Sequence, residues 1–563
     1  MANEPCTLYT CNRCGHVVGT HSDDALVEPS GFVDSLSLSN NPPTLIEQSA
    51  LQREYDDLRR ISAALDNEIA RLRASLEAFE KKKNDTDARL SAYRSALSPY
   101  RRLPIEILRI IFELCVEEDA NINARLEYTS QFPDSSSTLD IDKCPWALSQ
   151  VCRGWRNLVV SLPALWTAID MNWTEGEGKL PDALVERRLS LMLQRSRDQP
   201  LLVSWFEHSC TEKAVSLLCS STFRWSQATI RADIEGLSWL APYSGLFPAL
   251  STLRVNFESD GWFTEDETST ILSVFRDCPA LVNLTLSGDC DIVSHLASLF
   301  PWSQITHFTS LGDATDDDDS DSSDLMDSDI WENFETVLPL MVNVEECHLR
   351  SFGYTHDTEL SSPQTLERLH TLKLTCPQSL ESIYRLLDSV TLPSLRALHI
   401  VADSTDSLCT SIHRLLCRSQ CTVEDFKIVA ADYNIIVEIL KIPELQRICQ
   451  LGIGGFSESR LTSQRIMKVL EVEDDGSEGT IMPHLQLLRL TDVSVDEDTN
   501  AAIVKMLSSR QKQPSSSDTV RLEEVRFGEE GRFRLANESV LDAVRNLVTG
   551  GLVIRDPVGL IEV

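Results

Sequence analysis

The chain has little positive charge and no long hydrophobic run. Its 563 residues include 51 Lys and Arg but 86 Asp and Glu, which gives a formal net charge of -35 at pH 7. Nucleic acids and anionic membrane surfaces are polyanions, so this balance argues against either of them as a general partner. No stretch of about 18 apolar residues occurs, and the N-terminus lacks the pattern of a signal peptide. We therefore expect a soluble protein of the cytoplasm or the nucleus.

The sequence motifs of common catalytic sites are also absent. The chain contains no Gly-x-x-x-x-Gly-Lys-Ser/Thr phosphate loop, no Gly-x-Gly-x-x-Gly, no His-Glu-x-x-His and no Gly-x-Ser-x-Gly. Its 11 histidines are dispersed along the sequence. These absences predict a protein that is not an enzyme by itself.

Most of the 16 cysteines lie within apolar runs, which is typical of reduced, buried thiols. The exception is a cluster in the tail formed by residues 1–43, which contains Cys6, Cys11, Cys14 and His16. A Cys-x-x-Cys turn can place two thiolates on one Zn²⁺, and a third cysteine and a histidine complete a tetrahedral site. A second Cys-x-x-Cys is missing, so a disordered tail that contains cysteines by chance remains the alternative.

Residues 44–98 predict one long helix. Apolar residues recur every seven positions, and others follow four positions later: Leu51, Leu58, Leu65, Leu72 and Phe79, with Tyr55, Ile69 and Leu76. This alternation is typical of a coiled coil. Two outcomes are open for the helix, a homodimer or packing against the rest of the chain, and the heptads favour the homodimer.

Residues 99–170 predict a small cluster of amphipathic helices. Pro104 suits the first turn of a helix, and Glu106 complements its positive start. Two neighbouring apolar stripes follow, Ile107, Ile111 and Leu114 in one and Leu108, Phe112 and Cys115 in the other. Two stripes cover more apolar surface than one core contact needs, so part of it is expected to face a partner.

Three stretches of this region resemble the F-box, the helical module that docks on the Skp adaptor of cullin-RING ubiquitin ligases. They are Leu-Pro-x-Glu-Ile-Leu-x-x-Ile-Phe at 103–112, Leu-x-x-Val-Cys-Arg-x-Trp-Arg-x-Leu at 148–158 and Pro-x-Leu-Trp at 163–166. The acidic, Ser-rich segment 117–146 is longer than the usual spacer and resembles the insert of the split F-box found in many proteins of mushroom-forming fungi. The resemblance implies a set of adaptor-binding residues: Leu103, Pro104, Ile107, Leu108, Ile111, Phe112, Leu148, Val151, Cys152, Trp155, Leu158 and Trp166. A plain helical hairpin core is the alternative.

Residues 171–563 repeat a short apolar phrase of the form Leu-x-x-Leu-x-Leu. Strong or weaker copies begin at residues 250, 281, 305, 344, 369, 395, 423, 448, 485 and 522. This phrase at such spacing is the signature of leucine-rich repeats, in which each phrase forms a short strand that stacks parallel on the next. Helices between the phrases would return the chain, and three further strands are expected near 167–171, 201–206 and 227–234. An ordinary α/β domain is the alternative.

Two acidic segments interrupt the repeats, at 313–329 and 471–478. Runs of like charge repel one another and cannot be buried, so both predict disordered loops.

These features predict an α/β protein with an N-terminal coiled-coil helix, a small helical F-box-like module and a C-terminal leucine-rich-repeat-like solenoid. The resemblance implies a substrate-recognition subunit of a Skp-cullin-F-box type ubiquitin ligase, with the Skp adaptor and cullin complex and an unknown protein substrate as partners. The alternative is a non-catalytic coiled-coil and leucine-rich-repeat interaction scaffold unconnected to ubiquitin.

Overall fold

The computed structural model describes two separate units, residues 1–105 and 106–563. The described residues are 8–10, 17–19, 33, 38, 41–119, 137–172, 180–257, 271, 273–288, 296–311, 336–350, 363–376, 380–402, 407–430, 433–454, 460–472, 481–491, 497–511, 520–527 and 538–555. The expected zinc ligands Cys6, Cys11, Cys14 and His16 lie outside them, as do the acidic segment 313–329 and most of 471–478. Among the described residues, no helix combines the length and the apolarity needed to cross a lipid bilayer.

The first unit is dominated by the helix α2 (Leu45–Ala96), which confirms the long helix predicted for residues 44–98. It begins with a capping box, in which the Glu47 backbone N–H donates to Thr44 Oγ1 and the Thr44 backbone N–H donates to Glu47 Oε2. None of its residues is buried. The antiparallel strands β1 (Leu8–Thr10) and β2 (Val17–Gly19) precede it, and the short 3-10 helix η2 (Pro99–Arg102) follows.

The second unit is built on one sheet of 14 strands that follow the order of the chain and are parallel throughout. They are β3 (Ala168–Asp170), β4 (Leu201–Phe206), β5 (Trp225–Ala232), β6 (Thr252–Phe257), β7 (Asn283–Gly288), β8 (His307–Leu311), β9 (Glu346–Arg350), β11 (Thr371–Cys376), β13 (Ala397–Ala402), β14 (Asp425–Val429), β15 (Gln450–Gly454), β16 (Leu487–Leu490), β17 (Glu524–Phe527) and β18 (Val553–Arg555). Two short strands, β10 (Gln364–Thr365) and β12 (Val390–Thr391), pair with each other outside this sheet.

Each of the ten apolar phrases contains one of these strands, so the predicted strand positions are confirmed. The alternate apolar residues are buried, as Leu372 and Leu374 on β11 illustrate. They pair in register with Leu398 and Ile400 on β13, which stacks like residues across the sheet. The three earlier strands are also present as β3, β4 and β5, whereas β18 was not predicted.

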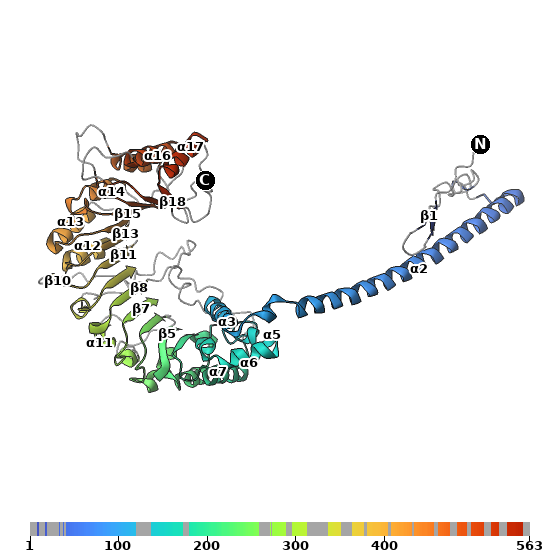
Figure 1. Cartoon of the computed structure of the whole chain (residues 1–563), viewed down its shortest axis with the longest axis horizontal. Coiled ribbons are helices and arrows are strands. Elements are labelled where there is room, and N and C mark those ends of the chain that lie inside the picture. The colour runs from blue at the N-terminus through green and yellow to red at the C-terminus, as the bar shows by residue number, and fades with distance from the viewer. Residues whose placement is uncertain are drawn as a thin grey trace. The chain divides into compact units, whose positions relative to one another are not determined.

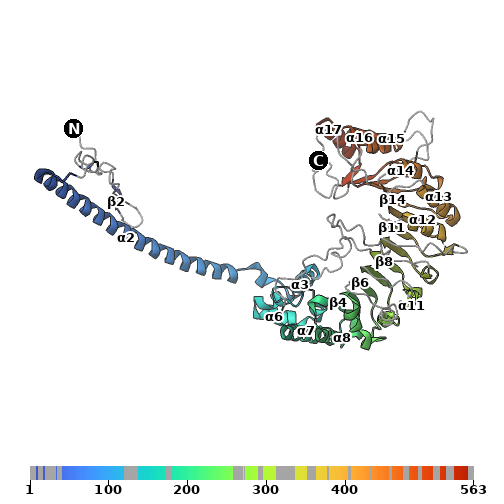
Figure 2. The ribbon, with the colours of Figure 1, turned by 180° about the vertical axis from the view of Figure 1, so that it is seen from behind.

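Helices line one face of the curved sheet, and the core lies between the two layers (Figures 1 and 2). They are α7 (Asp182–Ser196), α8 (Glu212–Cys219), α9 (Ile234–Ser238), α11 (Leu296–Leu299), α12 (Leu380–Ser389), α13 (Ser407–Ser419), α14 (Tyr433–Leu440), α15 (Arg460–Val469), α16 (Glu497–Gln511) and α17 (Glu538–Thr549). Short 3-10 turns complete the connections: η3 (Pro163–Trp166), η4 (Glu207–Ser209), η5 (Thr222–Arg224), η6 (Ala241–Tyr243), η7 (Ser273–Phe275), η9 (Trp302–Gln304), η11 (Leu338–Leu340) and η12 (Pro443–Leu445). The opposite face of the sheet carries no described helix, and we call it the open face.

The core beneath β5 to β8 contains an aromatic ladder, in which each ring contacts the next. Its members are Trp225, Phe247, Phe275, Phe300, Trp302 and Phe308, with successive ring centroids 5.1 to 6.4 Å apart. Large rings fill the space beneath these strands, and such ring contacts add to the free energy gained by burial.

Farther along the sheet, the buried Arg510 and the half-buried Arg418 connect neighbouring repeats. The Arg510 guanidinium on α16 donates to the carbonyls of Leu470, Ile481 and Met482 in the preceding connection. Arg418 on α13 donates in the same way to Leu387 and Val390. These carbonyls belong to residues at helix ends or in loops. The arginines therefore satisfy acceptors that would otherwise be buried without a partner. Burial lowers the pKa of Arg510 to about 10.

Candidate functional site

The F-box-like residues form a compact helical module at the start of the second unit. Its helices are α3 (Ile105–Asp119), α5 (Trp146–Val151) and α6 (Arg153–Ser161), followed by the turn η3. Phe112 of α3 packs edge-on against Trp155 of α6, with ring centroids 4.8 Å apart. Trp146 packs edge-on against Trp166 at 4.9 Å. The two halves of the module therefore contact each other directly despite the segment that separates them in sequence.

The segment 117–146, which we expected to be an insert, contributes to the module at both ends. Helix α3 continues to Asp119, and residues 137–146 are described and largely packed. The Thr138 backbone N–H donates to the Asp170 carbonyl at 3.1 Å, and the Asp170 N–H donates to Thr138 Oγ1 at 2.8 Å. Arg188 of α7 donates to the Leu139 carbonyl. Residues 117–119 and 137–146 of the expected insert therefore belong to the folded module, where Ser, Thr and Trp side chains that look like linker in the sequence satisfy buried polar groups, and residues 120–136 lie outside the described residues.

The residues implied as adaptor contacts separate into three groups. Phe112 and Trp166 are completely buried, and the Trp166 indole N–H donates to the Val159 carbonyl at 2.9 Å. Leu108, Leu148, Trp155 and Leu158 are partly buried and pack against the same core. Pro104, Ile107, Ile111, Val151 and Cys152 are exposed, and Leu103 is half-buried. The first group builds the module, and only the third presents side chains mainly to solvent.

Cys152 has a structural contact of its own. It is the N-cap of α6, and its Sγ accepts a hydrogen bond from the Trp155 backbone N–H at 3.4 Å. A thiol is an unusual cap, since oxygen side chains are preferred there. The exposed apolar neighbour Val151 precedes it at the end of α5.

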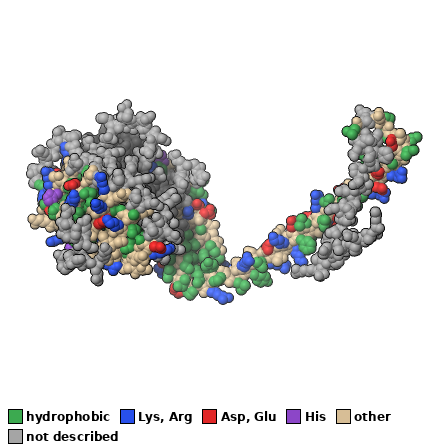
Figure 3. Space-filling model, turned by 90° about the horizontal axis from the view of Figure 1, so that it is seen from above, with side chains coloured by type: hydrophobic (Ala, Val, Ile, Leu, Met, Phe, Trp, Pro, Cys, Tyr) green, Lys and Arg blue, Asp and Glu red, His purple; other side chains and the backbone are tan. Residues whose placement is uncertain are grey.

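The exposed side of α3 carries a continuous apolar strip. Ile107, Ile110, Ile111 and Leu114 are 43%, 51%, 36% and 58% exposed, and we call these four residues the α3 strip. Their spacing of three, one and three residues places them on one helical face. Figure 3 shows hydrophobic side chains gathered in the part of the molecule where α3, α5 and α6 lie. Ile110 and Leu114 were not among the implied contacts, although the helical spacing identifies them.

Leaving this strip in water is unfavourable for an isolated protein. Burial of apolar surface contributes roughly 25 cal/mol per Å², so covering four large aliphatic side chains would stabilise a complex by several kcal/mol. Contiguous apolar patches of this kind mark protein–protein contacts. On α3, Arg109 and Glu113 form an ion pair at 2.8 Å beside the strip.

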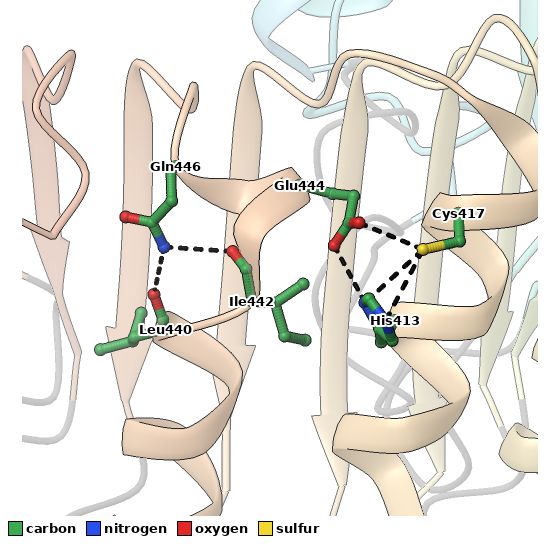
Figure 4. A network of polar contacts seen from close by, with 6 residues as sticks. All are labelled: His413, Cys417, Leu440, Ile442, Glu444 and Gln446. Atoms are coloured by element: carbon green, nitrogen blue, oxygen red, sulfur yellow. Dashed lines mark hydrogen bonds and ion pairs between the residues drawn. The ribbon is translucent and has the colours of Figure 1, made fainter.

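One group of described residues brings metal-ligating atoms together. His413 and Cys417 of α13 and Glu444 of η12 point toward one another (Figure 4). His413 Nδ1 lies 3.0 Å from Glu444 Oε2, and Cys417 Sγ lies 3.1 Å from Glu444 Oε1 and 3.7 Å from His413 Nδ1. Donor atoms in a tetrahedral zinc site are about 3.4–3.6 Å apart, so these separations are similar.

The three side chains also form a hydrogen-bonded cluster with one another. The hydrogen bond from the Cys417 thiol to Glu444 raises the pKa of the thiol, with burial and the carboxylate charge acting in the same direction. A metal would have to displace that proton, because only the thiolate is a good ligand. The pair Cys417 and Cys421, spaced by one helical turn, does not form a ligand group with these residues.

Glu207, which directly follows β4, has a strongly perturbed carboxyl group. Burial first, and then the neighbouring Asp233, raise the pKa of Glu207 to about 7. Glu207 Oε2 accepts from the Asp233 backbone N–H at 2.9 Å, and Asp233 Oδ1 accepts from the Gly236 N–H at 2.8 Å as the N-cap of α9. The pair thus ties β4 to the beginning of α9, and its role is structural.

No protein-family model matches the chain, and no curated protein matches it either.

Proposed function

We propose that the chain is the substrate-recognition subunit of a Skp-cullin-F-box type ubiquitin ligase. The observation that carries the proposal is the α3 strip. Phe112 on the same helix is completely buried against Trp155, so α3 already has a core face, and the strip is apolar surface beyond it. A helix with one buried and one exposed apolar face fits a docking module better than a closed hairpin core.

Under this proposal the parts of the chain have different roles. The α3 strip, with Val151 and the residues Leu103 and Pro104 that precede α3, would contact the Skp adaptor. Phe112, Trp155 and Trp166 would maintain the shape of the module. The 14-stranded sheet would act as a leucine-rich-repeat-like solenoid that presents its open face to a protein substrate. Transfer of ubiquitin would be carried out by partner proteins, since the chain lacks catalytic motifs.

Adaptor capture by purified full-length protein tests the proposal. We expect Ile110→Glu/Leu114→Glu to reduce capture of a recombinant Skp adaptor by about tenfold or more, because few apolar anchors usually dominate such an interface. Leu246→Glu/Val342→Glu is the matched control, since both residues are exposed apolar residues of the sheet region, 51% and 53% exposed. Wild-type-like capture by the α3 variant, or equal loss in the control, would contradict the proposal.

The scaffold alternative is favoured by a separate observation on α2. Its heptad residues are exposed, among them Leu58, Leu65 and Leu72 at 48%, 54% and 50%, and nothing described covers them. A second copy of the helix would bury this seam. We expect Leu65→Lys/Leu72→Lys to turn a dimer into a monomer in sedimentation experiments, while Ala63→Lys/Ala70→Lys on the opposite side of α2 leaves the dimer intact. A dimer that captures no adaptor would favour the scaffold.

A further inference from the structure

The parallel register of the sheet aligns one basic residue from almost every strand of its second half. On β9, β11, β13 and β14 the aligned residues are His348, Lys373, His399 and Lys427. The same row passes Gly452 on β15 and continues with Arg489, Arg526 and Arg555 on β16, β17 and β18. We call these residues the basic row. Lys, Arg and His together make up about one residue in nine of this chain, 51 and 11 of 563. In the row, seven of the eight aligned positions carry one of these residues, which is far above that average.

The basic row lies on the open face of the sheet. Burial alternates along β9, β14, β16 and β17, and the row residues occupy the half-exposed positions between buried ones. On β9, for example, Cys347 and Leu349 point into the core on either side of His348. Exposure of the side chains rises along the row, from 27% for Arg489 to 43% for Arg526 and 68% for Arg555. The arginines at the end of the row are therefore accessible to a ligand that approaches this face, whereas His399 is only 21% exposed.

Acidic residues are present on this face, but they lie to one side of the row. Glu346, Asp425 and Glu524 precede the row residues by two positions, toward the starts of the strands. Arg489 contacts Asp425 at 2.9 Å, and Glu524 contacts both Arg526 and Arg555 at 2.8 Å. These pairs neutralise part of the charge. Within the described part of the chain, Lys373 has no carboxylate at ion-pair distance, and Arg350 adds a further cation on the opposite side of the row.

Two details describe the surroundings of the row, one at His348 and one at Gly452. Burial first, and then the charges of Lys373, Arg350 and His399, lower the pKa of His348 to about 4, so His348 is neutral near pH 7 and adds no charge to the row. A Cβ atom on Gly452 would lie 2.9 Å from Lys427 Cγ. Because Gly452 has no side chain, the Lys427 side chain extends over its position in the row.

We propose that the basic row binds an acidic, carboxylate-rich peptide segment of a partner protein. That the bound segment belongs to a ligase substrate rests on the proposed function. That the row binds an acidic segment at all rests on the row alone. Neighbouring strands are about 4.8 Å apart, so the eight strands of the row span roughly 34 Å, and the part from Lys373 to Arg555, which excludes the neutral His348, spans roughly 29 Å. An extended peptide advances about 3.3 Å per residue, so a segment of about ten residues would follow the row.

The shape of the charge distribution favours a run of carboxylates over other anions. A single phosphate is best recognised by several guanidinium groups that converge on one point, whereas here the cations follow a line. The row arginines already contact carboxylates of their own chain, Asp425 and Glu524, which shows that this geometry suits such partners.

Binding of a fluorescent peptide of about ten residues, mostly Asp and Glu, to the full-length protein tests the inference. We expect measurable binding that weakens as salt concentration rises, and no binding of the matched Asn/Gln peptide. Lys373→Glu/Lys427→Glu should weaken binding of the acidic peptide by about tenfold, since two attractive charges become repulsive. Lys441→Glu/Lys468→Glu, with the same change of net charge on the helical side, should change it by less than about twofold.

Several results would overturn the inference. Equal losses in the two variants would mean that only net charge matters, and tighter binding of a singly phosphorylated peptide or of a single-stranded oligonucleotide would assign the row to another anion. Adaptor capture by Lys373→Glu/Lys427→Glu serves as the second readout and should equal that of the wild type. If the acidic peptide fails to bind while adaptor capture persists, the inference is wrong and the proposed function stands.

Discussion

The first and second halves of the sheet use the same strand pattern with different side chains on both faces. Beneath β5 to β8, the aromatic ladder fills the core, whereas from β9 onward aliphatic side chains of α12 to α16 fill it. On the open face, the register positions of the basic row are continued in the first half by Ser204, Thr229, Arg254, Thr285 and Thr309. The comparison shows that the buried pattern determines the strands, while the open face is free to vary.

The largest effect is expected in the core of the first half. Trp302 is 2% exposed and contacts Phe300 and Phe308 at 5.9 and 5.1 Å. Trp302→Ala would interrupt the ladder and should lower the free energy of unfolding by about 3–5 kcal/mol in urea denaturation. The exposed Phe223→Ala, in the same half, should cost less than about 0.5 kcal/mol. A similar cost for both would mean that burying Trp302 in the ladder does not stabilise the fold.

A comparable test in the second half of the sheet uses the buried Arg510. Arg510→Ala leaves the carbonyls of Leu470, Ile481 and Met482 without their donor, which should cost about 2–4 kcal/mol by the same measurement. Arg447→Ala, at an exposed position nearby, is the control and should be nearly neutral. A neutral Arg510→Ala would show that water replaces the guanidinium at these carbonyls.

The first half should also respond to pH through Glu207. Its pKa in the folded protein is about 7, against an ordinary value of 4.5, so the folded state binds the proton more tightly. The contribution of this group is therefore fully present below about pH 4.5 and is lost as the pH rises through 7. Glu207→Gln resembles the protonated form, and its melting temperature should exceed that of the wild type at pH 8. The difference should disappear near pH 4.5, and a difference independent of pH would contradict this assignment.

The smallest effect is expected for the thiol reactivity of the cluster formed by His413, Cys417 and Glu444 in the second half. Because the hydrogen bond to Glu444 raises the pKa of the Cys417 thiol, its thiolate is scarce at pH 8. Glu444→Gln should speed alkylation of Cys417 by iodoacetamide a few-fold, measured by mass spectrometry of the peptide that contains it. Alkylation of the exposed Cys152 gives the internal control. Unchanged reactivity of Cys417 would mean that Glu444 does not influence its ionisation.

The sequence predicts those parts of the fold that depend on local periodicity. Alternating apolar residues such as Leu395, Leu398 and Ile400 predict a buried strand, and heptads from Leu51 to Phe79 predict α2. The short strand β18 carries only Ile554 between exposed positions, so it has no comparable pattern. Its position follows from pairing with β17, which is a tertiary effect.

The candidate sites were only partly predictable, because they depend on contacts between distant residues. The helical stripe on α3 is visible in the sequence, but whether Phe112 or Ile111 faces the core is decided by Trp155, more than 40 residues later. Cys417 and Glu444 come from different repeats. The basic row likewise appears only once the register places each strand beside the next, since its members are separated by whole repeats.

The hydrogen bonds between Thr138 and Asp170 protect one edge of the long sheet. Strand β3 has β4 on one side, and on the other its Asp170 backbone is paired with Thr138 of the helical module. An unprotected edge strand is a template for pairing with another chain. A fragment that begins after Trp166 would expose this edge and should self-associate, whereas a fragment that ends after β17 removes only the opposite, short edge. The module and the sheet are therefore inseparable in practice, and the repeats cannot be expected to behave as a monomer without the helices that precede them.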